Sequence, residues 1–253
     1  MRGPTMFAPR CRPGAECGHM NSLVGADLAS KAGYALHHGF AVPARYLGMM
    51  IGFDAARPRL LARGIDPANG DISLPVELFV ALVVENIFAC GDETSGVGRR
   101  NVPLGTTALM VASALQAATL AECMHNLVEA ARIVRPDLYM CINRGPRTLK
   151  FSLSSRCEER LGEIELRMEF IALTLHCVFR RISGASLRPL YARASETLPG
   201  HPISLMQTFR CPLRRRGAGI TFYYDRADGD RPITPFDFSS WSGETLREFY
   251  RLV

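Results

Sequence analysis

The chain has 253 residues, of which 47% are hydrophobic and 21% charged, a balance that excludes a disordered protein. Its formal net charge is +6, and 28 of its 30 basic residues are arginines spread along the whole chain. DNA-reading domains usually gather such charge on one element, so this spread gives little support to direct DNA binding.

The first residues lack the long apolar core of a secretory signal, and no stretch approaches the roughly 20 uninterrupted apolar residues of a membrane span. We therefore expect a cytoplasmic protein without a membrane partner. Most of the eight cysteines lie in apolar periodic segments, where a free cysteine behaves as a small hydrophobic residue. We expect these thiols to be reduced.

The first half of the chain has the spacing of helices. Residues 1–25 are rich in Gly, Pro and Arg and lack periodicity, which predicts a flexible leader. Helices are predicted over 26–40, 76–88, 106–115 and 119–134. Another helix is predicted to begin at Pro43 and to be interrupted at Pro58. Thr119 and Glu122 stand three residues apart at the start of the 119–134 helix and predict a capping box.

After Pro136 the apolar period changes to that of strands. Strands are predicted over 138–142, 149–153, 187–192, 211–214 and 220–224, and helices over 161–183, 202–209 and 242–252. The first two strands form a hairpin. This order predicts an α+β fold with a helical N-terminal half, followed by a mainly antiparallel sheet packed against a long central helix.

Recognised catalytic and metal-binding patterns are absent, so we predict no catalytic residue, no metal and no cofactor. The His and Cys pairs that could suggest such chemistry are adjacent or two residues apart on predicted helices, so their side chains point in different directions. Gly96-Val97-Gly98 has no strand before it, as a dinucleotide-binding loop requires. The pairs and the short metal-like cluster are His37-His38, Cys123 with His125, His176-Cys177, and Cys11, Cys17 and His19.

A binding pocket is predicted between the 161–183 helix and the sheet, because pockets are mostly apolar with a few polar groups. Ordinary core packing explains most of its residues equally well. Arg210 and Arg214–Arg216 form the densest basic cluster, which reads either as a solvated turn or as a carboxylate clamp. The predicted ligand-binding residues are Tyr139, His176, Arg180, Tyr191 and Tyr224.

Several short motifs, in order, resemble one known family over roughly residues 45–240. They are Gly64-Ile65-Asp66-Pro67, Ile72-Ser73-Leu74-Pro75, Pro103-Leu104-Gly105, Ala118-Thr119-Leu120, Phe209-Arg210-Cys211-Pro212-Leu213 and Asp230-Arg231-Pro232-Ile233. The sequence resembles the arabinose-binding-like N-terminal domain of AraC/XylS-type transcription regulators. Arg215 departs from the pattern, since an aromatic residue usually stands at this position.

The resemblance implies a sensor that binds a small-molecule effector, often as a homodimer, and relays binding to DNA through helix-turn-helix elements expected after Val253. Residues 26–240 would form the regulatory domain, and 241–253 a terminal helix or the start of a linker. The 119–134 and 242–252 helices are candidate dimer faces. Two other classes stay open: a small enzyme with an unrecognised Cys/His site, and an interaction module that binds no ligand.

Overall fold

The computed structural model describes residues 41–66, 72–95, 100–155, 161–184, 186–194, 211–215 and 219–234. Several predicted elements lie outside these residues, and the structure leaves them as predictions. They are the leader 1–25, the helices 26–40, 202–209 and 242–252, and the Gly96-Val97-Gly98 loop.

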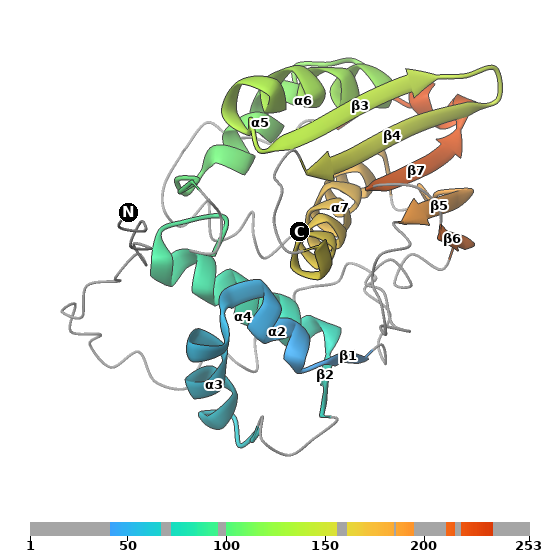
Figure 1. Cartoon of the computed structure of the whole chain (residues 1–253). Helices are drawn as coiled ribbons and strands as arrows, with labels where there is room; N and C mark the ends of the chain where they lie inside the picture. Colours follow the sequence, from blue (N-terminus) through green and yellow to red (C-terminus); the bar gives the residue numbers. More distant parts are fainter. Residues whose placement is uncertain are drawn as a thin grey trace, which may run out of the picture. The chain divides into compact units, whose positions relative to one another are not determined.

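The first described elements form a small helical cluster with its own apolar core (Figure 1). Its core holds Tyr46, Leu47, Leu74, Phe79 and Leu82, each at most 1% exposed. Two three-residue strands pair antiparallel within it, with Val42 opposite Leu74. The elements are β1 (Ala41–Pro43), α2 (Arg45–Ile51), α3 (Phe53–Leu61), β2 (Ser73–Pro75) and α4 (Val76–Cys90).

A five-stranded sheet forms the second half of the described chain, with the order β3-β4-β7-β5-β6. All its pairings are antiparallel except β5 with β6, which confirms the predicted mainly antiparallel α+β fold. Leu149, Phe151 and Leu153 alternate with more exposed residues along β4, so one face of the sheet is the core face. The strands are β3 (Leu138–Arg144), β4 (Thr148–Ser155), β5 (Tyr191–Ala194), β6 (Leu213–Arg215) and β7 (Ile220–Asp225).

Helices α5 (Thr106–Ala114) and α6 (Leu120–Val134) pack together, and α6 lies along β3 (Figure 1). The capping box predicted at the start of α6 is present: Glu122 N donates to Thr119 Oγ1, and the Glu122 carboxylate accepts from Thr119 N. The helix is amphipathic and buries Leu120, Met124 and Leu127 in the core that it shares with the sheet.

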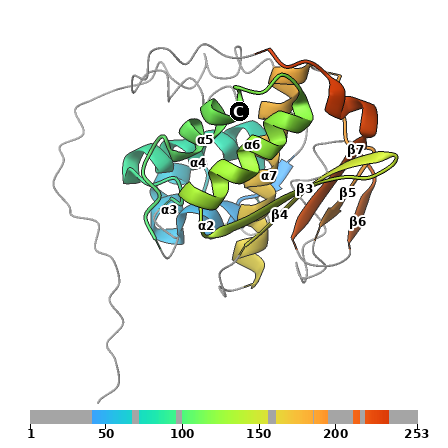
Figure 2. The ribbon, with the colours of Figure 1, turned by 90° about the horizontal axis from the view of Figure 1, so that it is seen from above.

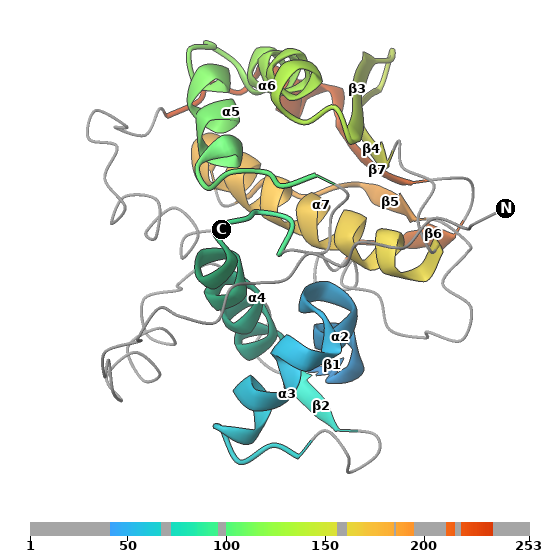
Figure 3. The ribbon, with the colours of Figure 1, turned by 60° about the vertical axis from the view of Figure 1, so that its left-hand side comes forward.

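Helix α7 (Leu161–Ser183) has the bounds predicted from its apolar spacing and lies between the two cores (Figure 3). Leu166 belongs to the core of the small helical cluster. Leu175 and Phe179 belong to the sheet core, where Phe179 meets Phe151 edge to face at 5.1 Å. Figure 2, viewed along another direction, shows the same helix beside the sheet. No described helix is long and apolar enough to cross a membrane.

Three local predictions differ from the structure. Pro58 lies inside α3 rather than interrupting it, and the helix continues because Ala62 N still donates to the Pro58 carbonyl. The short β1–β2 pair was not predicted, since three residues are too few for a visible alternation. Strand β5 begins at Tyr191 rather than Leu187, because Pro189 cannot donate a ladder hydrogen bond.

Candidate functional site

A cavity with a volume of about 540 Å³ lies beside α7 and is lined by described residues. Metabolite-sized ligands usually occupy cavities of ~300–1,000 Å³, so this volume suits one small molecule. Its lining combines an apolar part with polar and charged groups. The apolar part includes Val83, Ile87, Val134, Met168, Phe170 and Ile171, and the charged part consists of Glu93, Arg100, Arg135, Asp137 and Arg167.

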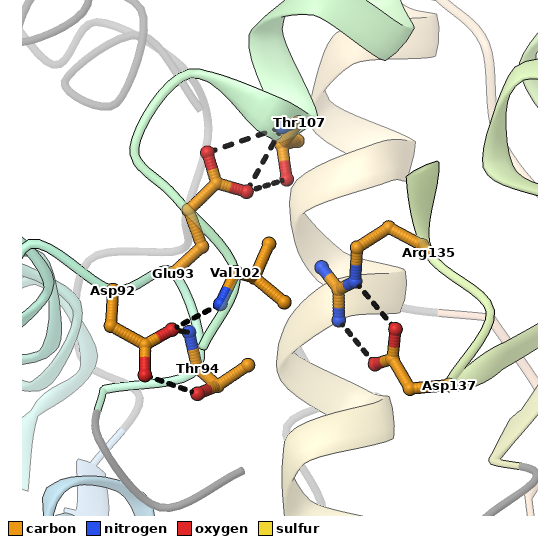
Figure 4. Close-up of polar contacts among 7 residues, drawn as sticks. All are labelled: Asp92, Glu93, Thr94, Val102, Thr107, Arg135 and Asp137. Carbon is orange, nitrogen blue, oxygen red and sulfur yellow. Dashed lines mark hydrogen bonds and ion pairs between the residues drawn. The ribbon is translucent and has the colours of Figure 1, made fainter. Parts of the chain in front are cut away.

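One wall of the cavity is the connection between α4 and α5, which Asp92 holds in shape. The Asp92 carboxylate accepts hydrogen bonds from Thr94 N, Thr94 Oγ1 and Val102 N at 2.7–2.9 Å (Figure 4). Asp92 is only 5% exposed, and Asn86 adds a buried hydrogen bond to the Ser95 carbonyl. These bonds hold the described parts of the connection, residues 91–95 and 100–105, together through contacts within the chain.

Glu93 fixes the same connection to the start of α5. Its carboxylate accepts from Gly105 N, Thr107 N and Thr107 Oγ1, the last at 2.6 Å. A carboxylate at a helix N-terminus satisfies backbone N–H groups that have no partner within the helix and interacts favourably with the helix dipole. Glu93 therefore lines the cavity while both of its oxygens are engaged.

The opposite side of the cavity contains a paired arginine and aspartate at the junction between α6 and β3. Arg135 Nε donates to Asp137 Oδ1 at 2.9 Å, and Arg135 Nη2 donates to Asp137 Oδ2 at 2.8 Å (Figure 4). The Arg135 side chain is 6% exposed. This two-point geometry fixes the plane of the guanidinium. The remaining nitrogen, Nη1, takes no part in the pair and is drawn directed away from Asp137.

A second, smaller cavity of about 60 Å³ adjoins the first and shares Ile87, Glu93, Arg135, Phe170 and Ile171 with it. Its other walls are mainly apolar. This volume is enough for a few water molecules but not for a metabolite. We therefore regard the larger cavity as the candidate ligand site.

Two of the five residues predicted to bind a ligand lie together under the sheet. His176 Nδ1 and Tyr224 Oη are 2.8 Å apart, and both side chains are buried. Burial, with a further contribution from the nearby Arg180 charge, lowers the pKa of His176 to about 3. Burial also raises the pKa of Tyr224 well above its usual value. Both groups are therefore neutral at physiological pH. Arg180 is half-buried one turn further along α7.

The other two predicted residues lie on the opposite face of the sheet. Tyr139 is 46% exposed, and Tyr191 stacks on Tyr223 with ring centroids 4.2 Å apart. The Arg214 guanidinium lies 4.6 Å from the Tyr191 ring centroid, so it caps this stack. The five predicted residues thus do not share one pocket, and none of them lines the 540 Å³ cavity.

The cavity residues Glu93, Arg135 and Asp137 were not predicted from the sequence. Arg135-Pro136-Asp137 carries a weak signal, because opposite charges flank a proline between a helix and a strand. Arg167 also carries one, as a cation within the apolar 161–183 segment. Neither signal indicates a cavity, because the walls come from five separated parts of the chain: Met50, residues 83–103, residues 134–137, Ser155 and residues 167–171.

The described residues contain no cluster of three or more His, Cys, Asp or Glu side chains placed to hold a metal ion. Among the described cysteines, burial raises the pKa of Cys123 to about 12 and that of Cys177 to about 11. A thiol is nucleophilic only as the thiolate, so these two cysteines are poor nucleophiles at neutral pH.

The comparison with protein families identifies the class of this chain. The family model described as the arabinose-binding domain of AraC transcription regulator, N-terminal, matches residues 52–233. The chain belongs to this family and is a regulator ligand-binding domain, which confirms the resemblance seen in its sequence motifs.

One similar solved structure is the crystal structure of transcriptional regulator CdpR from Pseudomonas aeruginosa. The two chains are 18% identical with a TM-score of 0.44, and the match covers 78% of this chain. It covers 59% of the CdpR chain, so this chain matches less than two thirds of that regulator. No curated protein matches the chain.

Proposed function

We propose that this chain senses a small-molecule effector for an AraC-type transcription regulator, and that the effector binds in the 540 Å³ cavity. The observation that carries the proposal is the cavity itself, which combines an apolar wall with fixed polar groups in a chain of this family. DNA binding would belong to helix-turn-helix elements outside the described residues, and the protein would act in the cytoplasm.

The position of the cavity suits a sensor because its walls belong to elements from both cores. Met50 and Val83 come from the small helical cluster, whereas Val134 and Asp137 come from the junction of α6 with the sheet. A ligand that binds one arrangement of these elements better than another shifts the equilibrium between the arrangements. Such a shift is the general basis of coupling to a second site.

Filling the cavity is expected to abolish effector binding. A thermal-shift screen of metabolites identifies a ligand, and saturation at ~100 times Kd is expected to raise Tm by about 5–10 °C. Ile171→Trp places an indole in the cavity and should reduce affinity for that ligand at least ~100-fold, measured by calorimetry, because the ligand and the indole cannot share the space.

Leu109→Trp is the matched control, because Leu109 is 55% exposed on α5 and does not line the cavity. It should bind the ligand as the native chain does. Unchanged binding by Ile171→Trp would refute the cavity as the site. Loss of affinity in His176→Ala and Arg180→Ala instead would favour the location predicted from the sequence, between α7 and the sheet.

The proposed function includes homodimerisation, and α6 offers the described candidate face. Ile133 is 81% exposed on α6, beside the exposed Glu129–Arg132 ion pair. Replacing Ile133 with Lys is expected to shift a dimer toward monomer by about tenfold in Kd, measured by sedimentation, since it puts a charge into an apolar contact. Leu61→Lys on α3 is the control. A native chain that remains monomeric at high concentration would exclude the dimer.

The thermal-shift screen of metabolites also distinguishes the proposed sensor from the two alternatives, a small enzyme and an interaction module that binds no ligand. An enzyme would convert its ligand, whereas a sensor would release it unchanged, which product analysis by mass spectrometry distinguishes. An interaction module would give no ligand-dependent rise in Tm. The raised pKa values of Cys123 and Cys177 support the non-enzymatic proposal, because both thiols are protonated at neutral pH.

A further inference from the structure

We infer that the effector of this cavity carries a carboxylate or phosphate group attached to an apolar body, and that arginines in the cavity wall bind the anion. The inference rests on the proposed function, because it names the ligand class of the same cavity. The experiment therefore gives one result if the anion preference is wrong and a different result if the cavity is not the effector site.

The two carboxylates in the wall would favour a cation if they were available, but both already have partners. Both Asp137 oxygens accept from Arg135. Both Glu93 oxygens accept from the first residues of α5, whose helix dipole offsets part of the negative charge. A ligand amine would have to compete with these fixed donors for each carboxylate.

Arg135 is positioned to donate a hydrogen bond to an anion. Its Nε and Nη2 hold Asp137, while Nη1 is left outside that pair in a side chain that is 6% exposed. Binding an anion would cost little further side-chain entropy, because Asp137 already fixes the plane of the Arg135 guanidinium. Low exposure also strengthens a charge-assisted hydrogen bond, since little water competes for the donor.

Arg100 and Arg167 also line the cavity, so three arginines face two carboxylates among the described lining residues. Arg100 is exposed and comes from the α4–α5 connection, whereas Arg167 comes from α7. Cations on separate walls attract an anion into the space between them, because their potentials add there.

The apolar part of the wall indicates the chemistry of the rest of the ligand. Val83, Ile87, Val134 and Phe170 present apolar surface to the same cavity. An inorganic anion would leave this apolar surface exposed to water, whereas an alkyl or aryl group would bury it, which is favourable. The combination of charges and apolar wall therefore favours an amphipathic anion over a sugar or a free ion.

The test uses four probes with one hexyl body on the full chain: hexanoate, hexyl phosphate, hexanol and hexylamine. Calorimetry is expected to show that at least one anion binds at least ~10-fold more tightly than hexanol, since charge-assisted hydrogen bonds are roughly twice as strong as neutral ones. Hexylamine should bind most weakly. The better of the two anions distinguishes a carboxylate effector from a phosphate effector.

Single variants locate the anion contact. Arg100→Gln and Arg167→Gln should each weaken the preferred anion by about 5–10-fold without changing hexanol affinity, because only the anion uses the lost charge. Arg132→Gln on the exposed side of α6 is the matched control and should change neither affinity. Ile171→Trp should abolish binding of all the probes.

The outcomes separate the two claims. Hexanol or hexylamine binding as tightly as the anions, with all binding lost in Ile171→Trp, would overturn the anion inference and leave the cavity as the effector site. Probe binding that survives Ile171→Trp would overturn both. If none of the probes binds up to its solubility limit, the anion inference is overturned, and the metabolite screen decides the proposed function.

Discussion

Asp137→Ala is expected to lower the free energy of unfolding by about 3 kcal/mol, because it leaves the Arg135 charge buried without its partner. The Arg135 side chain is 6% exposed and that of Asp137 is 31% exposed, so solvent screens the lost pair only in part. Urea denaturation followed by circular dichroism measures the change.

A double variant separates the stranded charge from other effects. Arg135→Met with Asp137→Ala should regain most of the loss, since an apolar side chain of similar length replaces the buried cation. Glu129→Ala is the control, because its ion pair with Arg132 is about half exposed on both sides and should contribute less than ~1 kcal/mol. A loss for Asp137→Ala no larger than that of the control would contradict the structural role of the pair.

His176→Phe is expected to remove a large part of the acid sensitivity of the fold. The folded-state pKa of His176 is lowered to about 3, by burial and by Arg180, so the unfolded chain takes up the proton first as pH falls. The contribution of neutral His176 to the free energy of unfolding is therefore fully present above the unfolded pKa of ~6.5. Below that pH it decreases by up to about 1.4 kcal/mol per pH unit.

At pH 7 the variant should be less stable than the native chain by about 1–3 kcal/mol, since it leaves Tyr224 Oη buried without His176 Nδ1. Between about pH 6.5 and 4.5 this difference should shrink by about 2 kcal/mol. Urea midpoints across this range measure both values. His125→Gln, on the exposed side of α6, should keep the native slope. Parallel slopes in native chain and His176→Phe would rule out a buried neutral histidine.

Elements with a strong local pattern could be predicted from the sequence. Helix α7 has its predicted bounds, because apolar residues recur at helical spacing along its length. Thr119 and Glu122 form their predicted cap because that motif depends only on neighbours in the chain. The β3–β4 hairpin also follows from alternation and a turn at Gly145.

The site could be predicted only in part, because its geometry depends on long-range packing. Burial of His176 and Tyr224 fits an apolar helix and strand, but the sequence does not show which faces meet. Tyr191 and Tyr224 lie on opposite faces because β5 pairs with β7 in a register that places Tyr191 beside Tyr223. A shift of one residue would exchange those faces, and no local pattern specifies it.

The placement of α7 restricts how relatives of this chain can vary in length. Leu166 packs in the small helical core and Phe179 packs in the sheet core, on one continuous helix. A single residue inserted between them would rotate the second half by ~100° relative to the first. One of the two cores would then lose its apolar contacts, so insertions and deletions should accumulate in the connections between elements, and the spacing from Leu166 to Phe179 should stay fixed.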